Sequence, residues 1–336
     1  MNVLLTSVGR RSYLADYFRE AMQGQGKIIG ANMYAEAAGM YAVDIPIVTP
    51  PANHPEYVPF LLDICYKYDV KLLCSLHDLD VFMLSQQRHR FHEADVFTTL
   101  PTAEWGRITL DKWECTQVFA AASIDVPWTT LHPYLAQDAI QRSEIKYPLI
   151  VKARVGYGSL GLRRCINRQE LEDAYESAKA AVIASGATQY IKLPEDELVL
   201  IQESITGREI CVSILNDLNG DFLSHFVCEV HNMRAGESDS ATSLDRVPFE
   251  PFARKISTLT KHSAYWGIDC LSDGNSLKVI DVNPRFTGDY PFHHLAGANV
   301  VRAVIQLVDN GSVNPDCLQH LPGIRGYKDI KPKMVI

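Results

Sequence analysis

The sequence lacks the patterns that mark three common classes of protein. Its eight cysteines are scattered and none forms a Cys-x-x-Cys pair, so neither a disulfide framework nor a structural zinc site is expected. No long basic run occurs, and a formal net charge of −8 makes a general affinity for nucleic acid improbable. No uninterrupted apolar stretch approaches the ~20 residues that span a bilayer. We therefore expect a soluble, cytoplasmic protein that neither enters membranes nor binds nucleic acid.

The first predicted turn also lacks the fingerprint of dinucleotide-binding proteins. Residues 7–12 contain one glycine where that fingerprint needs three, which disfavours a nicotinamide-dependent oxidoreductase. The two arginines of this turn, Arg10 and Arg11, could bind a carboxylate or phosphate through paired hydrogen bonds. Solvated arginines at the start of a helix are an equal alternative.

The first 100 of the 336 residues alternate between strand and helix patterns. We predict strands over residues 3–6, 27–31, 43–48 and 70–76, with helices near 13–22 and 57–65 and Ser12 as a helix cap. This rhythm predicts a parallel sheet with right-handed crossovers. Ligands of such sheets bind beyond the carboxyl ends of the strands, which places Arg11 and Asp78 on one rim.

The middle of the chain has the features of a phosphate-binding region. A predicted strand over residues 147–153 carries a lysine in an apolar run, which either extends to solvent or binds a buried anion; the second is favoured. The glycine-rich turn that follows suits a flap over phosphates, because glycine backbone can approach an anion closely. Ordinary hairpins share that composition. The residues proposed for this role are Lys112, Lys152, Gly156, Gly158, Ser159 and Gly161.

Further along, a strand ending near Glu203 leads into a predicted hairpin over residues 208–230. The backbone of Glu203, Ser204 and Ile205 could contact an adenine edge, and Glu209 could accept hydrogen bonds from ribose hydroxyls. A solvated strand end is the competing interpretation. The pattern then predicts a polar, turn-rich stretch over 231–245, a helix over 249–265, another over 300–308, and a loose tail beyond residue 322.

A hairpin over residues 266–283 gives the most specific signal. If its loop contains three residues, Ser272 pairs with Ser276, and Asp269 lies opposite Val279. Side chains alternate along a strand, so two residues of the second strand would share a face with Asp269. Carboxylate and amide oxygens suit Mg²⁺, whereas the plain alternative is a polar strand edge beside a turn. The proposed ligands are Asp269, Asp281 and Asn283.

The order of these motifs resembles that of the ATP-grasp superfamily, and more narrowly of the carbamoyl-phosphate-synthase-like ligases. The resemblance covers about residues 1–310. It implies an α/β and α+β fold of three domains, with a Rossmann-like parallel sheet in the first. The implied domains are an N-terminal one (1–104), a central lid (105–201) and a C-terminal one (202–336).

The resemblance also implies an ATP-dependent carboxylate–amine ligase. ATP would lie between the central and C-terminal domains, with Lys112 and Lys152 on its phosphates and residues 203–209 on its adenosine. The hairpin triad would hold Mg²⁺, or Mn²⁺ in its place. Asp281 stands where the family more often has glutamate. Arg285 would face the transferred phosphoryl group as the catalytic residue.

Selectivity for the small-molecule carboxylate and amine should come from other positions. His293 could act as a base for the amine, although a packed histidine is an equal alternative. The rival hypotheses are bicarbonate activation, phosphoryl transfer to a hydroxyl, and an inactive ATP-binding module. A homodimer is an assembly that the resemblance allows. The proposed substrate residues are Arg10, Arg11, Asp78, Arg234, Gly288 and His293.

Overall fold

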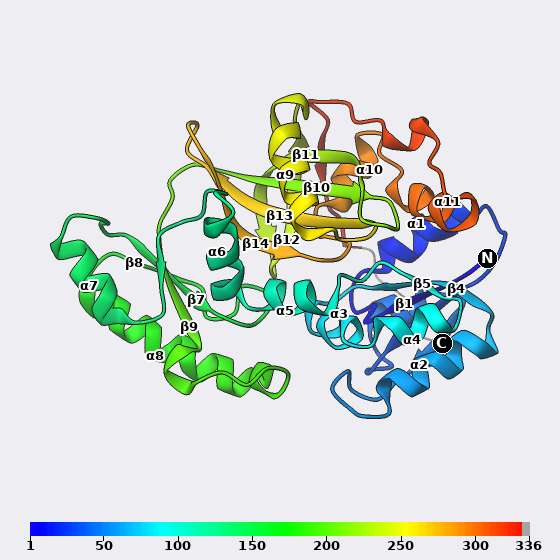
Figure 1. Ribbon diagram of the computed structural model, residues 1–336, viewed down its shortest axis with the longest axis horizontal. Helices are drawn as coiled ribbons and strands as arrows, with labels where there is room; N and C mark the ends of the chain where they lie inside the picture. Colours follow the sequence, from blue (N-terminus) through cyan, green and yellow to red (C-terminus); the bar gives the residue numbers. More distant parts are fainter. Residues whose placement is uncertain (331–336) are drawn as a thin grey trace.

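A computed structural model describes residues 1–330 of the protein. Residues 1–330 form three sheets, one parallel and two antiparallel, which follow one another along the sequence. Figure 1 shows the first sheet beside α2 and α4, the second beside α7 and α8, and the third beside α9. The predicted combination of α/β and α+β structure is confirmed.

The first sheet contains five parallel strands. Strand β1 lies in its middle, and its successive side chains point to opposite faces. Val3 and Leu5 join one buried hydrophobic cluster, while Leu4 joins another. Burial on both faces is typical of parallel sheets that helices cover on both sides. In spatial order the strands are β3 (Ile45–Val48), β2 (Ile28–Asn32), β1 (Asn2–Thr6), β4 (Val70–Ser75) and β5 (Phe97–Thr98).

One helix on this sheet comes from the far end of the sequence. Leu14 and Phe18 of α1 share a hydrophobic cluster with Val300 and Val304 of α11, and the two helices lie side by side in Figure 1. The C-terminal helix therefore completes the core of the N-terminal sheet. The helices that cover the sheet are α1 (Ser12–Met22) and α11 (Val300–Asn310) on one face, and α2 (Tyr57–Lys67), α3 (Asp78–Ser85) and α4 (Arg88–Glu93) on the other.

The second sheet is small and antiparallel, and helix α8 packs against it. The side chain of Asn167 accepts a hydrogen bond from the backbone N–H of Glu170 and so caps α8. The strands are β6 (Thr129–Thr130), β9 (Val199–Glu203), β7 (Leu149–Ala153) and β8 (Arg163–Cys165) in spatial order. Helices α7 (Pro133–Gln141) and α8 (Arg168–Ser185) pack on this sheet, whereas α5 (Ala103–Leu110) and α6 (Lys112–Ala121) join the hydrophobic cluster of the third sheet.

The third sheet has six antiparallel strands, and it corrects three predictions. The stretch 231–245 is a second hairpin rather than a loop; the helix predicted over 249–265 ends at Thr260; and part of the tail pairs with β12. Residues 331–336 lie outside the described part. The strands in order are β14 (Leu277–Asn283), β13 (Tyr265–Ser272), β10 (Arg208–Asn216), β11 (Phe222–Arg234), β12 (Glu237–Ser243) and β15 (Arg325–Tyr327), with α9 (Glu250–Thr260) and α10 (Tyr290–Leu295) beside them.

Two finer predictions were wrong in detail. The β13–β14 hairpin pairs Ser272 with Leu277, and a bulge shifts the register so that Asp269 lies opposite Asp281 rather than Val279. In the N-terminal sheet, Arg11 rather than Ser12 precedes α1, and no side chain caps that helix. Within residues 1–330, no helix is both long and apolar enough to cross a membrane.

Candidate functional site

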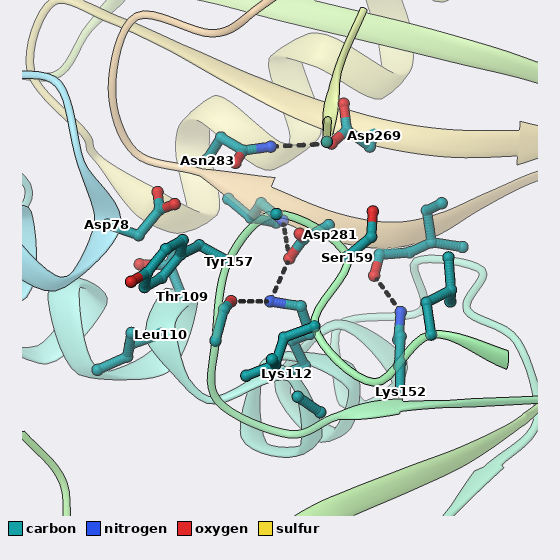
Figure 2. A pocket seen from close by; sticks show the side chains of 18 of the residues that line it. Asp78, Thr109, Leu110, Lys112, Lys152, Tyr157, Ser159, Asp269, Asp281 and Asn283 are labelled. Atoms are coloured by element: carbon teal, nitrogen blue, oxygen red, sulfur yellow. Dashed lines mark hydrogen bonds and ion pairs between the residues drawn. The ribbon is translucent and has the colours of Figure 1, made fainter. Parts of the chain in front are cut away.

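A cavity of about 320 Å³ lies where the three sheets approach one another. Its walls come from the start of α3, the junction of α5 and α6, the glycine-rich loop after β7, and the β13–β14 hairpin (Figure 2). Residues distant in sequence therefore converge on one space. Of the residues predicted for function, those that line it are Asp78, Lys112, Lys152, Gly156, Gly158, Ser159, Glu209, Asp269, Asp281, Asn283 and Arg285.

Two lysines form the cationic wall of the cavity. Lys112 Nζ lies 3.2 Å from Asp281 Oδ1 and donates to the carbonyl of Gly156 at 3.3 Å. Lys152 Nζ donates to the carbonyl of Ile280 at 2.9 Å, and burial lowers its pKa to about 8. No carboxylate within residues 1–330 forms an ion pair with Lys152. A buried ammonium without an ion-pair partner favours an anionic ligand.

The adjoining wall carries the predicted metal ligands. The bulge brings Asp269 and Asp281 side by side on neighbouring strands, and Asn283 Nδ2 donates to Asp269 Oδ2 at 2.9 Å. Burial, together with the charges of Asp281 and Asp289, raises the pKa of Asp269 to about 7. A divalent cation would relieve this excess of negative charge, and carboxylate and amide oxygens are the donors that Mg²⁺ prefers. The residues present therefore fit Mg²⁺.

Arg285 lies beside this acidic wall and forms an ion pair with the N-terminal sheet. Its Nε and Nη2 donate to the two oxygens of Asp78 at 2.7 Å each, and Nη2 also donates to Asn283 Oδ1 at 3.1 Å. Although burial opposes it, the neighbouring guanidinium holds the pKa of Asp78 well below its usual range. Arg285 is thus fixed at the cavity edge, with its charge already partly balanced.

The glycine-rich loop closes the cavity from the side of the second sheet. Gly158 has a φ of +63°, and a Cβ on Gly236 of the β11–β12 turn would lie 2.6 Å from the Gly158 Cα. The loop and this turn therefore touch through backbone alone. Tyr157, at the loop tip, packs edge-on against His77 with ring centroids 4.3 Å apart. These contacts connect the glycine-rich loop to the third sheet at Gly236 and to the N-terminal part of the chain at His77.

A smaller chamber of about 50 Å³ adjoins the cavity and contains other predicted substrate residues. Arg11 and Gly288 line it, and Arg11 Nε lies 2.9 Å from Glu237 Oε1. Asp289 contributes a buried carboxylate. The chamber is therefore lined by positively and negatively charged side chains within a small volume.

Seven predicted residues lie outside the walls of both spaces. Arg10 is exposed; Gly161 packs on α8, where a Cβ would meet Ala178 at 2.8 Å; and Glu203 forms an ion pair with Lys278. Arg234 forms an ion pair with Asp239 on the surface of the hairpin. These placements give the seven residues no direct contact with either space. The full set is Arg10, Gly161, Glu203, Ser204, Ile205, Arg234 and His293.

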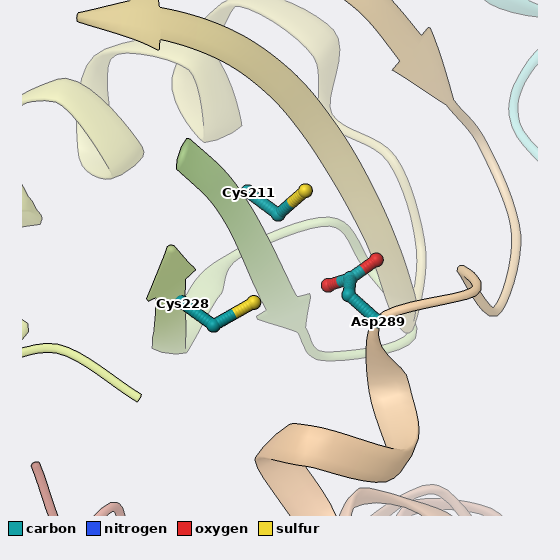
Figure 3. A group of neighbouring side chains, drawn as sticks. All are labelled: Cys211, Cys228 and Asp289. Atoms are coloured by element: carbon teal, nitrogen blue, oxygen red, sulfur yellow. The ribbon is translucent and has the colours of Figure 1, made fainter. Parts of the chain in front are cut away.

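His293 is fully buried, and its contacts differ from those expected of a base that meets substrate. Its Nε2 lies 2.9 Å from Asp289 Oδ2, so the histidine supports a carboxylate that lines the chamber. Behind this carboxylate lie two buried thiols, Cys211 and Cys228 (Figure 3). Hydrogen bonding to Cys228 and burial raise the pKa of Cys211, whose thiol donates to Asp269 Oδ1 at 3.1 Å. The cysteine therefore helps to orient Asp269, one of the predicted metal ligands.

Sequence reasoning missed several residues that line the cavity and the chamber. The end of α5 and the β11–β12 hairpin carry most of them, and both elements were absent from the predicted organisation. The Ala-Gly pair at 235–236 is the available signal, since such a pair between polar runs is consistent with a tight turn. The missed residues include Thr109, Leu110, Met233 and Gly236.

Comparison with known families divides the chain after its first sheet. Residues 3–99 match the model of the PylC-like N-terminal domain, and residues 109–289 match that of the ATP-grasp domain. The chain is 25% identical over 183 residues to the propionyl-CoA carboxylase alpha chain of Ruegeria pomeroyi, covering 51% of this chain and 26% of that protein. It is 29% identical over 116 residues to the D-alanine–D-alanine ligase of Nitrosomonas europaea, covering 33% of this chain and 32% of that protein. The matched regions thus span about a third or less of these curated relatives.

Solved structures show the same fold across nearly the whole chain. A biotin carboxylase complex from Campylobacter jejuni superposes with a TM-score of 0.72 at 18% identity, covering 95% of this chain and 73% of that one. An L-amino acid ligase from Bacillus licheniformis superposes with a TM-score of 0.66 at 16% identity, covering 91% of this chain and 73% of that one. Both comparisons show the fold alone. Because the ATP-grasp model matches more than half of the chain, and the sheets, loop and hairpin have the expected order, the chain belongs to the ATP-grasp family.

Proposed function

We propose that this chain is an ATP- and Mg²⁺-dependent ligase that joins a carboxylate to an amine. One observation carries the proposal: two lysines and two aspartates line a single cavity together with a glycine-rich loop. Such a site can hold a triphosphate by its charge while leaving room beside it for a second anionic substrate. No nucleophilic serine or cysteine is needed.

The reaction follows from the charge of the substrates. A carboxylate is a poor electrophile, so its oxygen first attacks the γ-phosphorus of ATP, and ADP leaves. The resulting acyl phosphate then reacts with the amine; the C–N bond forms, phosphate leaves, and the nitrogen loses a proton. The protein mainly supplies positioning and neutralisation of charge on the phosphoryl oxygens.

Each wall of the cavity has a part in this proposal. Lys112 and Lys152 would neutralise the phosphates of ATP, and the glycine-rich loop would exclude water from the acyl phosphate. Asp269, Asp281 and Asn283 would hold Mg²⁺, which when bound offsets charge on the triphosphate. Arg285, already aligned by Asp78, would stabilise the phosphoryl group during transfer.

The proposed adenosine contacts have unequal support. Glu209 lines the cavity and forms no ion pair within residues 1–330, so it stays a candidate for the ribose hydroxyls. Residues 203–205 lie past the cavity walls, at the end of β9. An adenine contact there requires the base to extend beyond the cavity toward the Glu203–Lys278 ion pair.

The test is a substrate matrix. The protein is incubated with ATP, Mg²⁺ and paired acids and amines; phosphate release is followed, and mass spectrometry identifies the bond formed. Asp281→Ala should abolish Mg²⁺-dependent ADP formation without altering the circular dichroism spectrum. Asp309→Ala, which removes an exposed carboxylate on α11, is the matched control and should retain activity. Unchanged turnover in Asp281→Ala would refute the assignment.

Bicarbonate activation is the second candidate. Similarity to carboxylases, including the propionyl-CoA carboxylase alpha chain and the biotin carboxylase structure, is the observation that favours it. Bicarbonate is also a carboxylate, and the same cavity residues would serve its phosphorylation. ATP cleavage that depends on bicarbonate, with no requirement for another acid, would select this alternative over the first.

A further inference from the structure

A second cavity, of about 280 Å³, lies apart from the proposed ATP site. It is formed by α4, the segment through β5, and the turn between β10 and β11, so it joins the N-terminal sheet to the third sheet. It shares no lining residue with either space of the candidate site. Nothing in the proposed ligase mechanism uses it.

An arginine without a counter-charge lines this cavity. Arg88 is half-buried, and its only side-chain hydrogen bond within residues 1–330 runs from Nε to His92 Nε2 at 3.4 Å. Burial lowers the pKa of Arg88. No carboxylate in that range forms an ion pair that would offset this effect. Asp95 also lines the cavity, but its carboxylate pairs with Lys71 at 2.9 Å. A partly desolvated guanidinium without a partner favours the binding of an anion.

A buried hydroxyl on the same wall gives independent evidence for a ligand. Thr98, at the end of β5, is 2% exposed, and its Oγ1 has no hydrogen-bond partner within the described residues. Buried polar atoms in native proteins are nearly always paired, and Thr98 lines the cavity, so a turn of its side chain toward the cavity would bring the covered hydroxyl to a bound group. The exposed side chain of Asn219 lies at the rim as a further polar group.

The rest of the wall is apolar. Val96 is buried, Phe97 is 38% exposed, and Leu218 comes from the turn of the third sheet. An apolar surface around a few convergent polar groups is the usual composition of a small-molecule site. The polar groups would fix a charged head, and the apolar side chains would contact its body.

We propose that this cavity binds a small organic anion, with its carboxylate or phosphate oxygens held by Arg88 and Thr98. The apolar body of the anion packs against Phe97 and Leu218. Because the cavity joins two parts of the chain, the bound anion also stabilises their contact. The proposal is independent of the reaction that the ATP site performs.

The test measures the binding of benzoate and phenyl phosphate, with benzamide as the neutral counterpart, by calorimetry on the full chain. At least one anion should bind about tenfold or more tightly than benzamide, and the tighter of the two identifies the preferred head group. Arg88→Met should weaken that binding about tenfold, and Thr98→Val severalfold. Arg90→Met, on the same helix but outside the cavity, is the control and should leave the affinity unchanged.

The outcomes separate this cavity from other sites. An anion that binds the ATP site instead would keep its affinity in Arg88→Met, and that result would overturn the proposal, as would anions that bind no tighter than benzamide. Thr98→Val provides a check on the folded state. Since it removes an orphan hydroxyl at nearly constant volume, it should not lower the Tm of the free protein. A lowered Tm would show that the hydroxyl is already paired, and would remove the second observation.

Discussion

Asp78 and Arg285 stand 207 positions apart in the sequence, yet each oxygen of the carboxylate accepts one N–H of the guanidinium at 2.7 Å. Asp78 begins α3 on the N-terminal sheet, whereas Arg285 follows β14 of the third sheet. Paired parallel hydrogen bonds fix both distance and orientation. This ion pair therefore sets the position of an arginine at the cavity through a contact between two parts of the fold.

Removal of one member of the pair should destabilise the protein more than removal of both. Asp78→Asn leaves the buried guanidinium of Arg285 without a counter-charge, a change that costs about 3–5 kcal/mol in buried pairs. The double variant with Arg285→Met should recover much of that loss, because no buried charge remains. Thermal unfolding of the two single variants and the double variant tests this ranking. Additive losses would show that the two side chains act independently.

Lys152→Met should weaken ATP binding by about tenfold or more, since a hydrogen bond to a charged group is worth ~1.5–3 kcal/mol. The fold should tolerate the change, because Lys152 has no ion-pair partner among the described residues and the variant removes a buried charge. Lys146→Met, an exposed lysine just before the same strand, is the matched control. Calorimetric titration with a nonhydrolysable ATP analogue measures the nucleotide affinity of both variants. Wild-type affinity in Lys152→Met would count against a phosphate contact.

Two hairpin glycines allow the contact of the glycine-rich loop to be isolated. Gly236 and Gly274 have φ values of +78° and +94°, so alanine strains the backbone at both. Only at Gly236 would the new Cβ collide with another segment, the Gly158 backbone. Gly236→Ala should therefore displace the loop and raise the KM for ATP about tenfold more than Gly274→Ala does. Equal effects would indicate that strain alone is responsible.

Glu237 should make stability depend on pH in the acidic range. Although burial opposes it, the charges of Arg11 and Lys328 lower the pKa of Glu237 from 4.5 to about 2. A lowered carboxyl pKa stabilises the folded state above pH 4.5, and this contribution is lost as the pH falls toward 2. Glu237→Gln should thus be less stable than wild type at pH 7, by on the order of 3 kcal/mol.

Chemical denaturation of Glu237→Gln and wild type across this range tests the pH dependence. The stability difference should shrink between pH 4.5 and 2. Glu93→Gln, which alters an exposed carboxylate on α4, serves as the control and should show no such trend. A difference that does not change with pH would exclude an electrostatic origin.

Much of the site could be predicted because its signals are local. A lysine in an apolar strand, a glycine-rich turn, and acids on one hairpin each depend on a few neighbouring residues. The register of that hairpin could not be predicted, since the bulge beside Asp269 depends on the geometry of the turn and on pairing with β10. The bulge nevertheless brings the two aspartates closer together than the predicted register would.

The parts that escaped prediction depend on distant contacts. Strand β12 is polar along most of its length and has little apolar alternation, so only its pairing with β11 and β15 identifies it as a strand. Its turn supplies Gly236 and positions Glu237, two residues that no local pattern marked as functional. The Asp78–Arg285 pair is likewise a product of packing between sheets rather than of spacing in the sequence.

The position of α11 has a consequence for synthesis. The apolar surface of the N-terminal sheet against which Val300 and Val304 pack stays uncovered on a ribosome until residues 300–310 have emerged. Domains that are complete in sequence can fold as they are made, but this one must wait for its last helix. A fragment that ends at residue 104 would therefore expose this apolar surface and aggregate. Nascent chains that expose the same surface would bind chaperones.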